Sequence, residues 1–436
     1  MKVSGRTATD IAASLERGLY AGAQVSGEAL PTVRRLAADL GVSPATVSSA
    51  YKLLRTRGLV VGGGRRGTRI SPRILTQFSG AQPALPVGTI DLATGNPDPA
   101  LLFPLGPAML LIKHELRLYA GQSDHPVLTA FASAEFEADG VSGQSVAVMG
   151  GAMDAIERVL REHLRPGDRV AVEDPSFPGI IDLIAASGYT SVPFAMDDDG
   201  PLPDAVAGAL SQGCGAIIVT PRAQNPTGAA ISVERADALR RVLRGFPGIV
   251  LIENDHAGPV AGAAMHTLTS LSQPPWAVVR SVSKFLGPDL RVAVMAADPL
   301  TVDRVRGRQA LGSRWTSHIL QQLALMLWSD PSSGRRLARA GEIYAHRRNA
   351  VRTALRARNI QAVGRSGFNL WVPVRDEASV VRSMAERGWA VAAGERFRLQ
   401  AAPAIRVTVS ALQPRDADRF AGDLADSLRP SHVGFA

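Results

Sequence analysis

Apolar residues recur with a helical period in the first part of the chain, which predicts helices over residues 7–19, 33–40 and 44–55. Gly41 follows the second predicted helix and suits its end, because glycine adopts the left-handed conformation there without strain. Ser43 precedes the third helix and can cap it, with a proline at the first helical position. A short helix, a glycine turn and a capped helix are typical of a helix-turn-helix motif.

Two short strands are predicted at residues 59–61 and 68–70, on either side of a glycine-rich tip that carries Arg65 and Arg66. Such a hairpin can act as a wing that reaches DNA phosphates or the minor groove. The polar face predicted for the third helix consists of Thr46, Ser48, Ser49, Lys52 and Arg55. Helix pairs with a glycine turn are common by themselves, so the charge of the region is needed to indicate its function.

Positive charge is concentrated in this same region. Residues 1–75 contain 12 basic and 4 acidic residues, a net charge of +8, whereas the whole chain carries +9. A surface that only improves solubility would spread its charge more evenly. The asymmetry therefore favours a polyanion-binding segment joined to a nearly neutral body.

The periodicity disappears between residues 73 and 89, where proline and glycine recur, and we expect a linker there. From residue 90 to 436, strand-like apolar runs alternate with helix-like segments, which predicts an α/β domain around a largely parallel sheet. A long helix after Arg335, followed by short strands and helices, indicates a C-terminal α+β subdomain from about residue 330. The expected domains are thus 1–72, the linker and 90–436.

The composition is that of a globular protein, with 436 residues of which 46% are apolar and 20% charged. No run of eighteen apolar residues and no apolar leader segment occurs, so we expect neither a membrane span nor a signal peptide. Cys214 is the only cysteine and excludes an internal disulfide, which favours a cytoplasmic location. Its thiol is expected to be inert, and we expect no metal site.

Lys284 is the strongest candidate for chemistry in the large domain. It follows residues 276–279, an apolar run predicted to be a buried parallel strand, and ligands bind at such strand ends in open α/β sheets. A partly buried lysine amine can form a Schiff base with an aldehyde. Ser281, Ser283 and Arg291 around it would suit a phosphate, and an aldehyde that carries a phosphate is pyridoxal 5'-phosphate (PLP). A surface lysine beside an arginine is the ordinary alternative.

Two other strand ends carry groups that would suit the same ligand. Gly150 and Gly151 precede a predicted helix that begins near Ala152 and Met153, where free backbone N–H groups could hold a phosphate. Phe177 follows another strand and could stack on a ring, or could simply be a core residue at a turn.

Asn225 and Asp255 follow the next two predicted strands. Asn225 could donate a hydrogen bond to a phenolate oxygen. The carboxylate of Asp255 could keep a pyridinium nitrogen protonated and so make the ring an electron sink. Taken alone, Asp255 is better explained as a helix cap, so the order of the motifs has to decide between these roles.

That order, over residues 90–410, resembles fold-type I PLP enzymes of the aspartate aminotransferase family. The motifs of residues 8–72 resemble the winged helix of GntR-type bacterial regulators. A GntR-type winged helix fused to an aminotransferase-like domain is the architecture of the MocR regulators, and the chain is identified as a member of that family. The resemblance implies a winged helix-turn-helix, a fold-type I α/β domain and a homodimer that binds an operator in double-stranded DNA.

The resemblance also assigns roles to matched residues. Lys284 would form the internal aldimine with PLP, Asp255 would contact the pyridine nitrogen, and Asn225 the 3-hydroxyl. Arg406 would bind the α-carboxylate of an amino-acid effector. The other implied cofactor contacts are Ala152, Met153, Ser281, Ser283 and Arg291 at the phosphate, Phe177 on the ring, and Tyr119 from the second subunit. The implied DNA contacts are Arg34, the start of the recognition helix with Ser43, Thr46, Ser48 and Lys52, and the wing with Arg65 and Arg66.

His256 departs from the family pattern. Many relatives have a tyrosine there that hydrogen-bonds the cofactor's 3-oxygen, and a histidine in that place counts against efficient transamination. It could contact the cofactor, or it could be a structural loop residue.

Three functions follow from these features. The first is a PLP-dependent or PLP-responsive transcription regulator with an amine or amino-acid effector. The second is a working aminotransferase that carries a DNA-binding domain. The third is a sensor of PLP itself that controls vitamin B6 supply, suggested by the similarity of residues 91–99 and 256–259 to B6-salvage members. The sequence leaves open the effector, the operator, and whether the protein activates or represses.

Overall fold

The computed structural model is described here for residues 3–20, 28–56, 59–62, 67–70, 85–86, 88–112, 118–119, 121–269 and 275–429. It divides into two compact units, each described by itself. The first contains Met1–Ala84 with Leu164–Val170 and Gly179–Val192, and the second contains Leu85–His163, Ala171–Pro178 and Pro193–Ala436.

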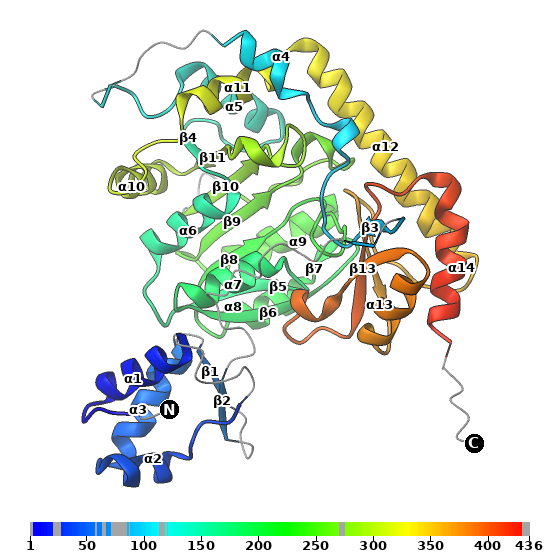
Figure 1. Ribbon diagram of the computed structural model, residues 1–436. Helices are drawn as coiled ribbons and strands as arrows, with labels where there is room; N and C mark the ends of the chain where they lie inside the picture. Colours follow the sequence, from blue (N-terminus) through cyan, green and yellow to red (C-terminus); the bar gives the residue numbers. More distant parts are fainter. Residues whose placement is uncertain are drawn as a thin grey trace, which may run out of the picture. The chain divides into compact units, whose positions relative to one another are not determined.

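The N-terminal part has three helices and a two-stranded hairpin, as predicted (Figure 1). Its elements are α1 (Ala8–Tyr20), α2 (Val33–Leu40), α3 (Pro44–Thr56), β1 (Val60–Gly62) and β2 (Thr68–Ile70). The two strands pair antiparallel, with Val60 opposite Ile70. The tip residues Arg65 and Arg66 lie outside the described residues.

Local signals set the ends of these helices. Gly41 closes α2 at φ 64, and its backbone N–H points to the last carbonyls of that helix. The hydroxyl of Ser43 accepts a hydrogen bond from the backbone N–H of Thr46 at 3.1 Å and thereby caps α3. The face of α3 opposite the predicted polar face is buried and consists of Val47, Ala50, Tyr51 and Leu54. The hydroxyl of Tyr51 donates to the carbonyl of Pro31 at 2.7 Å.

The large domain is built on an eight-stranded sheet with the strand order β4-β11-β10-β9-β8-β5-β6-β7. Its strands are β4 (Val146–Met149), β5 (Arg169–Asp174), β6 (Thr190–Asp197), β7 (Gly200–Pro201), β8 (Cys214–Val219), β9 (Val250–Asp255), β10 (Trp276–Ser281) and β11 (Ala293–Ala297). β8, β9 and β10 run parallel, whereas β11 pairs antiparallel with both β10 and β4. The three parallel strands carry the candidate site at their carboxyl ends.

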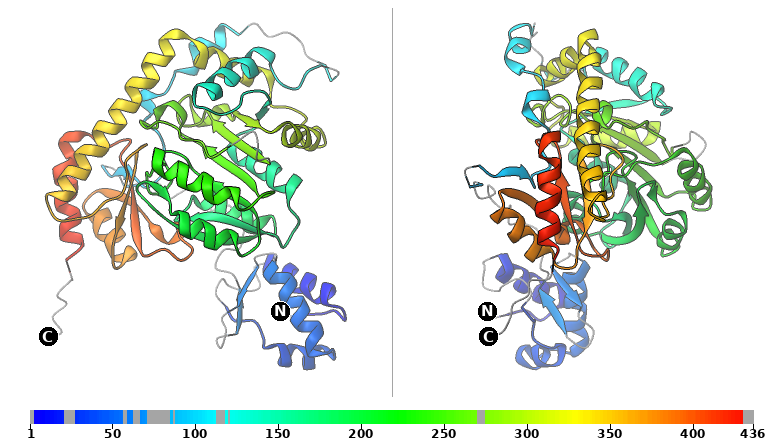
Figure 2. Two further views of the ribbon diagram at one scale, coloured as in Figure 1. Left: turned by 180° about the vertical axis from the view of Figure 1, so that it is seen from behind. Right: turned by 90° about the vertical axis from the view of Figure 1, so that its right-hand side faces the viewer.

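Helices lie on both faces of this sheet and enclose its strands (Figures 1 and 2). They are α4 (Leu105–Leu110), α5 (Pro126–Ala138), α6 (Ala152–His163), α7 (Pro178–Ala186), α8 (Pro203–Leu210), α9 (Val233–Arg244), α10 (Pro299–Ala310) and α11 (His318–Ser329). α12 (Pro331–Arg356) is the long helix predicted after residue 335, and it extends from the region of α4 to the C-terminal subdomain (Figure 1).

The C-terminal subdomain has a second, four-stranded sheet in the order β12-β14-β13-β3. It consists of β12 (Asn369–Pro373), β13 (Trp389–Ala393) and β14 (Ala404–Thr408), with α13 (Glu377–Glu386) and α14 (Ala417–Ser427) beside them. The fourth strand, β3 (Ile90–Leu92), comes from the start of the large domain and pairs parallel with β13. It brings the segment that follows it next to β14, where Arg406 lies.

Every strand and helix that the alternating pattern predicts between residues 145 and 252 is present. The antiparallel strand β11 and the strand β3 were not predicted. Most of the predicted linker lies outside the described residues. Among the helices that the structure describes, none is both long and apolar enough to cross a membrane.

Candidate functional site

Lys284 lies three residues beyond the end of β10 and is half-buried. Its Nζ donates a hydrogen bond to the carbonyl of Gly95 at 2.8 Å and lies 5.9 Å from the centre of the Phe368 ring. Burial lowers the pKa of Lys284 to about 8, and the charge of Arg406 adds to this decrease. A substantial fraction of the amine is therefore unprotonated near neutral pH, which is the form that attacks a carbonyl carbon.

Groups that bind anions surround the turn before Lys284. The hydroxyl of Ser281 donates to the hydroxyl of Ser283 at 2.9 Å, and Ser281 Oγ accepts from the backbone N–H of Ser283 at 3.2 Å. Arg291 Nη2 donates to the carbonyl of Gly150 at 3.3 Å, which places this guanidinium at the turn before α6. A Cβ on Gly151, which has φ +123°, would lie only 2.7 Å from Arg291 Nη2. Glycine thus allows the turn, the arginine and the N-terminus of α6 to share one site.

Arg406 on β14 connects the C-terminal subdomain to this site. Its Nη1 donates to Asn225 Oδ1 at 3.1 Å, and its Nη2 donates to the carbonyl of Ala93. Its guanidinium also lies 4.7 Å from the centre of the Phe397 ring. Within the described residues its buried Nε has no hydrogen-bond partner. Burial lowers the pKa of Arg406 to about 10, so the side chain still carries its charge at neutral pH.

One short segment, which includes Ala93 and Gly95, contacts both Arg406 and Lys284. Arg406 in turn contacts Asn225. Gly95, whose carbonyl accepts from Lys284, has φ +70, and a Cβ there would lie 3.0 Å from Arg406 Nη1. The structure thus brings together an amine, a carboxamide and a guanidinium that the sequence pattern predicted for one site.

Asp255, the last residue of β9, is fully buried, and arginines contact both of its oxygens. Arg222 donates from Nε to Oδ1 and from Nη2 to Oδ2, each at 2.9 Å. Arg280 donates from Nε to Oδ2 at 2.7 Å, and the backbone N–H of Gly258 donates to Oδ1 at 3.2 Å. Both arginines also pair with Asp139. Burial by itself would raise the pKa of Asp255, but the two arginines outweigh it and hold the pKa well below its usual range.

His256 points its Nε2 toward the carbonyl of Ala223, at 2.8 Å. Since a carbonyl only accepts, this nitrogen carries the proton in the neutral ring. Burial lowers the pKa of His256 to about 4, and the positive charge of Lys284 contributes. The imidazole is therefore neutral at physiological pH and lies close enough to Lys284 for the charge of the lysine to lower the pKa of His256.

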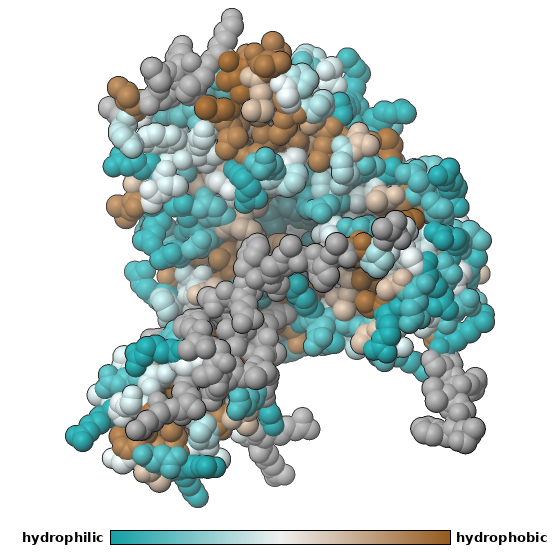
Figure 3. Space-filling view, viewed as in Figure 1, coloured by the Kyte–Doolittle hydropathy of each residue, from teal (hydrophilic) through white to brown (hydrophobic). Residues whose placement is uncertain are grey.

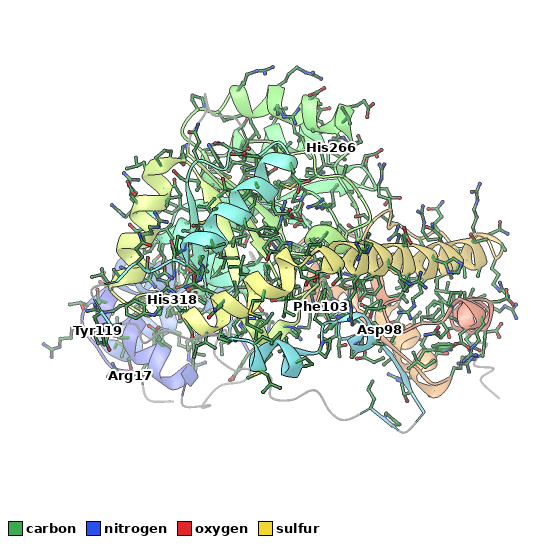
Figure 4. All side chains as sticks on the ribbon, turned by 90° about the horizontal axis from the view of Figure 1, so that it is seen from above. Arg17, Asp98, Phe103, Tyr119, His266 and His318 are labelled. Atoms are coloured by element: carbon green, nitrogen blue, oxygen red, sulfur yellow. The ribbon has the colours of Figure 1, made fainter. Side chains whose placement is uncertain are left out.

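The remaining predicted cofactor residues occupy the edges of the site or lie away from it. Ala152 and Met153 are the first residues of α6 and are half-buried, and Phe177 just before α7 is 37% exposed. Tyr119 is 76% exposed, and its ring contacts Trp315 and the guanidinium of Arg314. Figure 4 shows Tyr119 beside His318 and well apart from Asp98, which is close in sequence to Gly95. Within one chain, Tyr119 therefore lies away from the segment that contacts Lys284.

Glu253, two residues before Asp255, is a second buried carboxyl on β9. It accepts hydrogen bonds from the Thr267 hydroxyl at 2.5 Å and from the backbone N–H of Leu268 at 2.7 Å. Burial raises the pKa of Glu253 to about 7, although these hydrogen bonds act in the opposite direction. Its side chain is fully enclosed, so its protonation state is linked to folding.

We expect Glu253→Gln to make stability less dependent on pH. The unfolded chain releases this proton near pH 4.5 and the folded chain near 7, so the wild-type protein loses stability as pH rises between these values, by about 3 kcal/mol in total. Glutamine does not titrate, and it can accept from the backbone N–H of Leu268 through Oε1 and donate from Nε2 to the hydroxyl oxygen of Thr267. The difference between the thermal midpoints of the variant and the wild type should therefore grow in favour of the variant from acidic to slightly alkaline pH. Glu157→Gln, at an exposed carboxyl, is the control, and parallel pH profiles for Glu253→Gln and wild type would contradict the expectation.

The candidate DNA-binding face lies on α2 and α3. Arg34, at the second position of α2, is exposed, as are Ser48 and Lys52 on α3. Ser43 is also exposed, but its hydroxyl is held by the cap of α3 and lies 2.9 Å from the Thr46 hydroxyl. Thr46, predicted to face outward, is half-buried because it takes part in that cap. Arginine and lysine side chains on an exposed helix pair are what phosphate and base contacts require.

Sequence reasoning did not find Arg222 and Arg280, which hold Asp255, or Asn254, the buried residue before it. Arg280 could have been noticed, since a charged residue inside an apolar strand is rarely buried without a partner. No cluster of metal-binding side chains occurs among the described residues.

Comparisons with known proteins assign a family to each part of the chain. The family of aminotransferases of class I and II matches residues 108–424, and the gntR family of bacterial regulatory proteins matches residues 7–70. Aminotransferases of this class depend on PLP.

Similar proteins include regulators over the full length. The vitamin B6 salvage pathway transcriptional repressor PtsJ of Salmonella typhimurium is 37% identical over 431 residues, which cover 98% of this chain and 99% of PtsJ. The pyridoxine biosynthesis regulator PdxR of Corynebacterium glutamicum is 25% identical over 80% of this chain and 78% of its own. The fold of the large domain is also that of LysN, an α-aminoadipate aminotransferase of Thermus thermophilus, with a TM-score of 0.69 and 23% identity over 78% of this chain and 92% of LysN.

Proposed function

Because this chain belongs to the MocR group of GntR-type regulators, which join a winged helix to an aminotransferase class I and II domain, we propose that it binds PLP at Lys284 and controls transcription of genes for vitamin B6 supply. The observation that carries the proposal is the position of Lys284. Its amine has a lowered pKa and lies between anion-binding groups and Arg406, on the same chain as a DNA-binding domain.

The residues present fit PLP. Ser281, Ser283, Arg291 and the first backbone N–H groups of α6 offer donors for its phosphate, and Gly151 leaves room for them to converge. The aldehyde of PLP condenses with a primary amine, which Lys284 supplies. Asn225 offers a carboxamide for the ring 3-oxygen, and Phe177 offers an aromatic surface at the rim.

Arg406 is proposed to receive the carboxylate of an effector, if an amino acid serves as one. Its guanidinium is charged and buried, Asn225 is the one side chain among the described residues to which it donates a hydrogen bond, and its Nε has no partner there. PLP itself is the other candidate effector. The names of PtsJ and PdxR, both tied to vitamin B6, favour PLP for this chain as well.

A homodimer is part of the proposal, and an exposed apolar surface supports it. Met109, Leu110 and Leu111 at the end of α4 are between 57% and 88% exposed, and Leu118 and Tyr119 are exposed as well. Figure 3 shows hydrophobic residues gathered around α4 at the top of the molecule. An exposed apolar surface of this kind favours contact with a second copy. Two winged helices in one dimer would then bind two DNA half-sites at a fixed spacing.

A working aminotransferase is the second candidate, since Lys284 and Arg406 are both in place. Incubation of the PLP-loaded protein with a panel of amino acids and keto acids distinguishes the two functions. Sustained turnover would favour the enzyme, and its absence in a protein that binds both PLP and DNA favours the regulator.

The experiment that tests the regulator measures DNA affinity with and without PLP. DNA sequences that bind the full-length protein are first selected from a random pool, and their affinity is then measured by fluorescence anisotropy. PLP should change this affinity by about 5- to 150-fold, the usual range of allosteric coupling. Equal affinities in the presence and absence of PLP would overturn the proposal.

On the same DNA, Arg34→Ala should weaken binding by about tenfold and reduce the slope of log affinity against log salt concentration by about 1, because one phosphate contact is lost. Anisotropy titrations at several salt concentrations measure both quantities. Arg429→Ala, at an exposed arginine near the C-terminal end of the described chain, is the control and should leave the slope unchanged. An unchanged slope for Arg34→Ala would remove Arg34 from the interface.

A further inference from the structure

The last residues of β9 alternate between two faces of the sheet that differ in chemistry. In the parallel pairing of β9 and β10, Asp255 lies opposite Arg280, and Asn254 lies opposite Val279. Cross-strand neighbours share a face, and so do residues two apart on one strand. Asp255 and Arg280 therefore face one side, whereas Asn254, Val279 and Ser281 face the other. Ser281 belongs to the anion-binding turn, so Asn254 is on the pocket side.

Asp255 has no oxygen left for a ligand. Its carboxylate accepts three hydrogen bonds from Arg222 and Arg280 and one from the backbone of Gly258, and its side chain is fully buried. These partners hold it on the face away from Ser281. A contact between Asp255 and a ligand in the pocket would require this ionic cluster to be broken, which is costly for a buried charge.

Asn254 is in the opposite situation. Its side chain is 95% buried, with 5% of its surface exposed, and its Oδ1 accepts no hydrogen bond from the described residues. A buried polar atom without a partner lowers stability, so a group of this kind in a native protein calls for a ligand or other partner. The next residue on the same face is His256, which is close enough to interact electrostatically with Lys284.

Building on the proposed PLP site, we propose that Asn254, and not Asp255, faces the ring nitrogen of PLP, and that a neutral carboxamide there leaves this nitrogen unprotonated. A carboxylate would attract a proton to the ring, but an amide carries no net charge and cannot offset a buried pyridinium. The pocket already contains the positive charge of Arg406, which further disfavours a second cation. Oδ1 is the unpaired atom in the structure, and rotation of the amide about its Cβ–Cγ bond would put Nδ2 in its place, where it can donate to the unprotonated nitrogen.

This assignment has a consequence for the chemistry of the site. A protonated ring withdraws electrons strongly, and an unprotonated ring does so weakly. With Asn254 in this position, the site holds PLP firmly through Lys284 and the phosphate groups but assists bond breaking at a bound amino acid poorly. Asn254 is thus a specificity-determining residue that favours a sensor over an aminotransferase.

The test uses PLP labelled with ¹⁵N at the ring and bound to the full-length protein. The ¹⁵N NMR signal of wild type should lie where unprotonated pyridine nitrogens resonate at neutral pH. In Asn254→Asp, the pKa of the ring nitrogen should rise by about 1–3 and the signal should move toward that of pyridinium. Asp182→Asn, at a carboxylate on α7 outside the pocket, is the matched control and should leave the signal unchanged.

The outcomes separate this inference from the proposed function. A protonated ring in wild type would overturn the inference while leaving PLP binding intact, and the wild-type spectrum alone decides this if the variant fails to fold. An Asn254→Asp protein that folds and binds PLP without a shift of the ring signal would also overturn the inference and leave PLP binding intact. A protein that binds no PLP at all would overturn the proposed function and the inference with it.

Discussion

After removal of free PLP, the Lys284→Ala protein should show no absorption band above about 400 nm, whereas the wild-type protein should keep one that borohydride removes. The chain has only four lysines, Lys2, Lys52, Lys113 and Lys284, so few amines compete for the aldehyde. Lys284 has the lowered pKa that reaction near neutral pH requires. Loss of the covalent bond should lower the affinity for PLP by at least about 100-fold, equivalent to about 2.7 kcal/mol.

Two controls make this result specific. Lys284→Arg keeps the positive charge but cannot form the linkage, so it should behave like Lys284→Ala. Lys52→Ala removes an amine on the DNA-binding helix and should keep the band. Peptide mapping of the borohydride-treated wild type should find the label on the peptide that contains residue 284. A band of equal intensity in Lys284→Ala would contradict the assignment.

Arg280→Met should lower the free energy of unfolding of the large domain by about 3–5 kcal/mol, because it leaves a buried carboxylate poorly compensated. Arg280 donates to Asp255 at 2.7 Å, pairs with Asp139, and lies 4.8 Å from the centre of the Phe136 ring. In the variant, Arg222 alone would face two carboxylates. Denaturant unfolding monitored by fluorescence measures the loss.

The effect should depend on pH in a defined direction. The pKa of Asp255 in the folded protein is depressed, so its ion pairs contribute stability above the ordinary carboxyl pKa of 3.8, and this contribution is lost as pH falls through the folded pKa. The difference between wild type and Arg280→Met should therefore be largest at neutral pH and shrink in acid. Arg161→Met, which breaks an exposed pair with Glu157, should cost at most about 1 kcal/mol. A loss of only about 1 kcal/mol for Arg280→Met would show that the ion pairs around Asp255 contribute little to the stability of the protein.

Much of the architecture could be predicted because it is determined locally. Gly41 and Ser43 set a helix end and a helix start through their own backbone and hydroxyl groups, and the structure has both as predicted. Apolar runs such as residues 216–219 are buried strands because they are covered on both faces. The direction of β11, antiparallel to both of its neighbours, could not be predicted, since its apolar run has the same appearance as a parallel strand.

The site was harder to predict, because side-chain direction depends on register. The sequence shows that Asn254 and Asp255 end a strand, but only the pairing with β10 decides which of the two faces Ser281. Likewise, Arg222 and Arg280 are far apart in the chain, and only the fold brings them together at Asp255 and Asp139. The roles predicted for Asn225, Arg406 and the other cofactor residues stay predictions until a ligand is bound.

The alternation along β9 and β10 also constrains how this protein can evolve. A one-residue deletion within either strand would shift the residues beyond it to the opposite face. On β9 such a shift would bring Asp255 into the pocket and Asn254 into the ionic cluster, and so would place a charged group in the pocket and a neutral one in the cluster. Related chains should therefore differ in loop length around these strands far more often than in strand length, while single substitutions at residue 254 offer a direct path between sensing and catalysis.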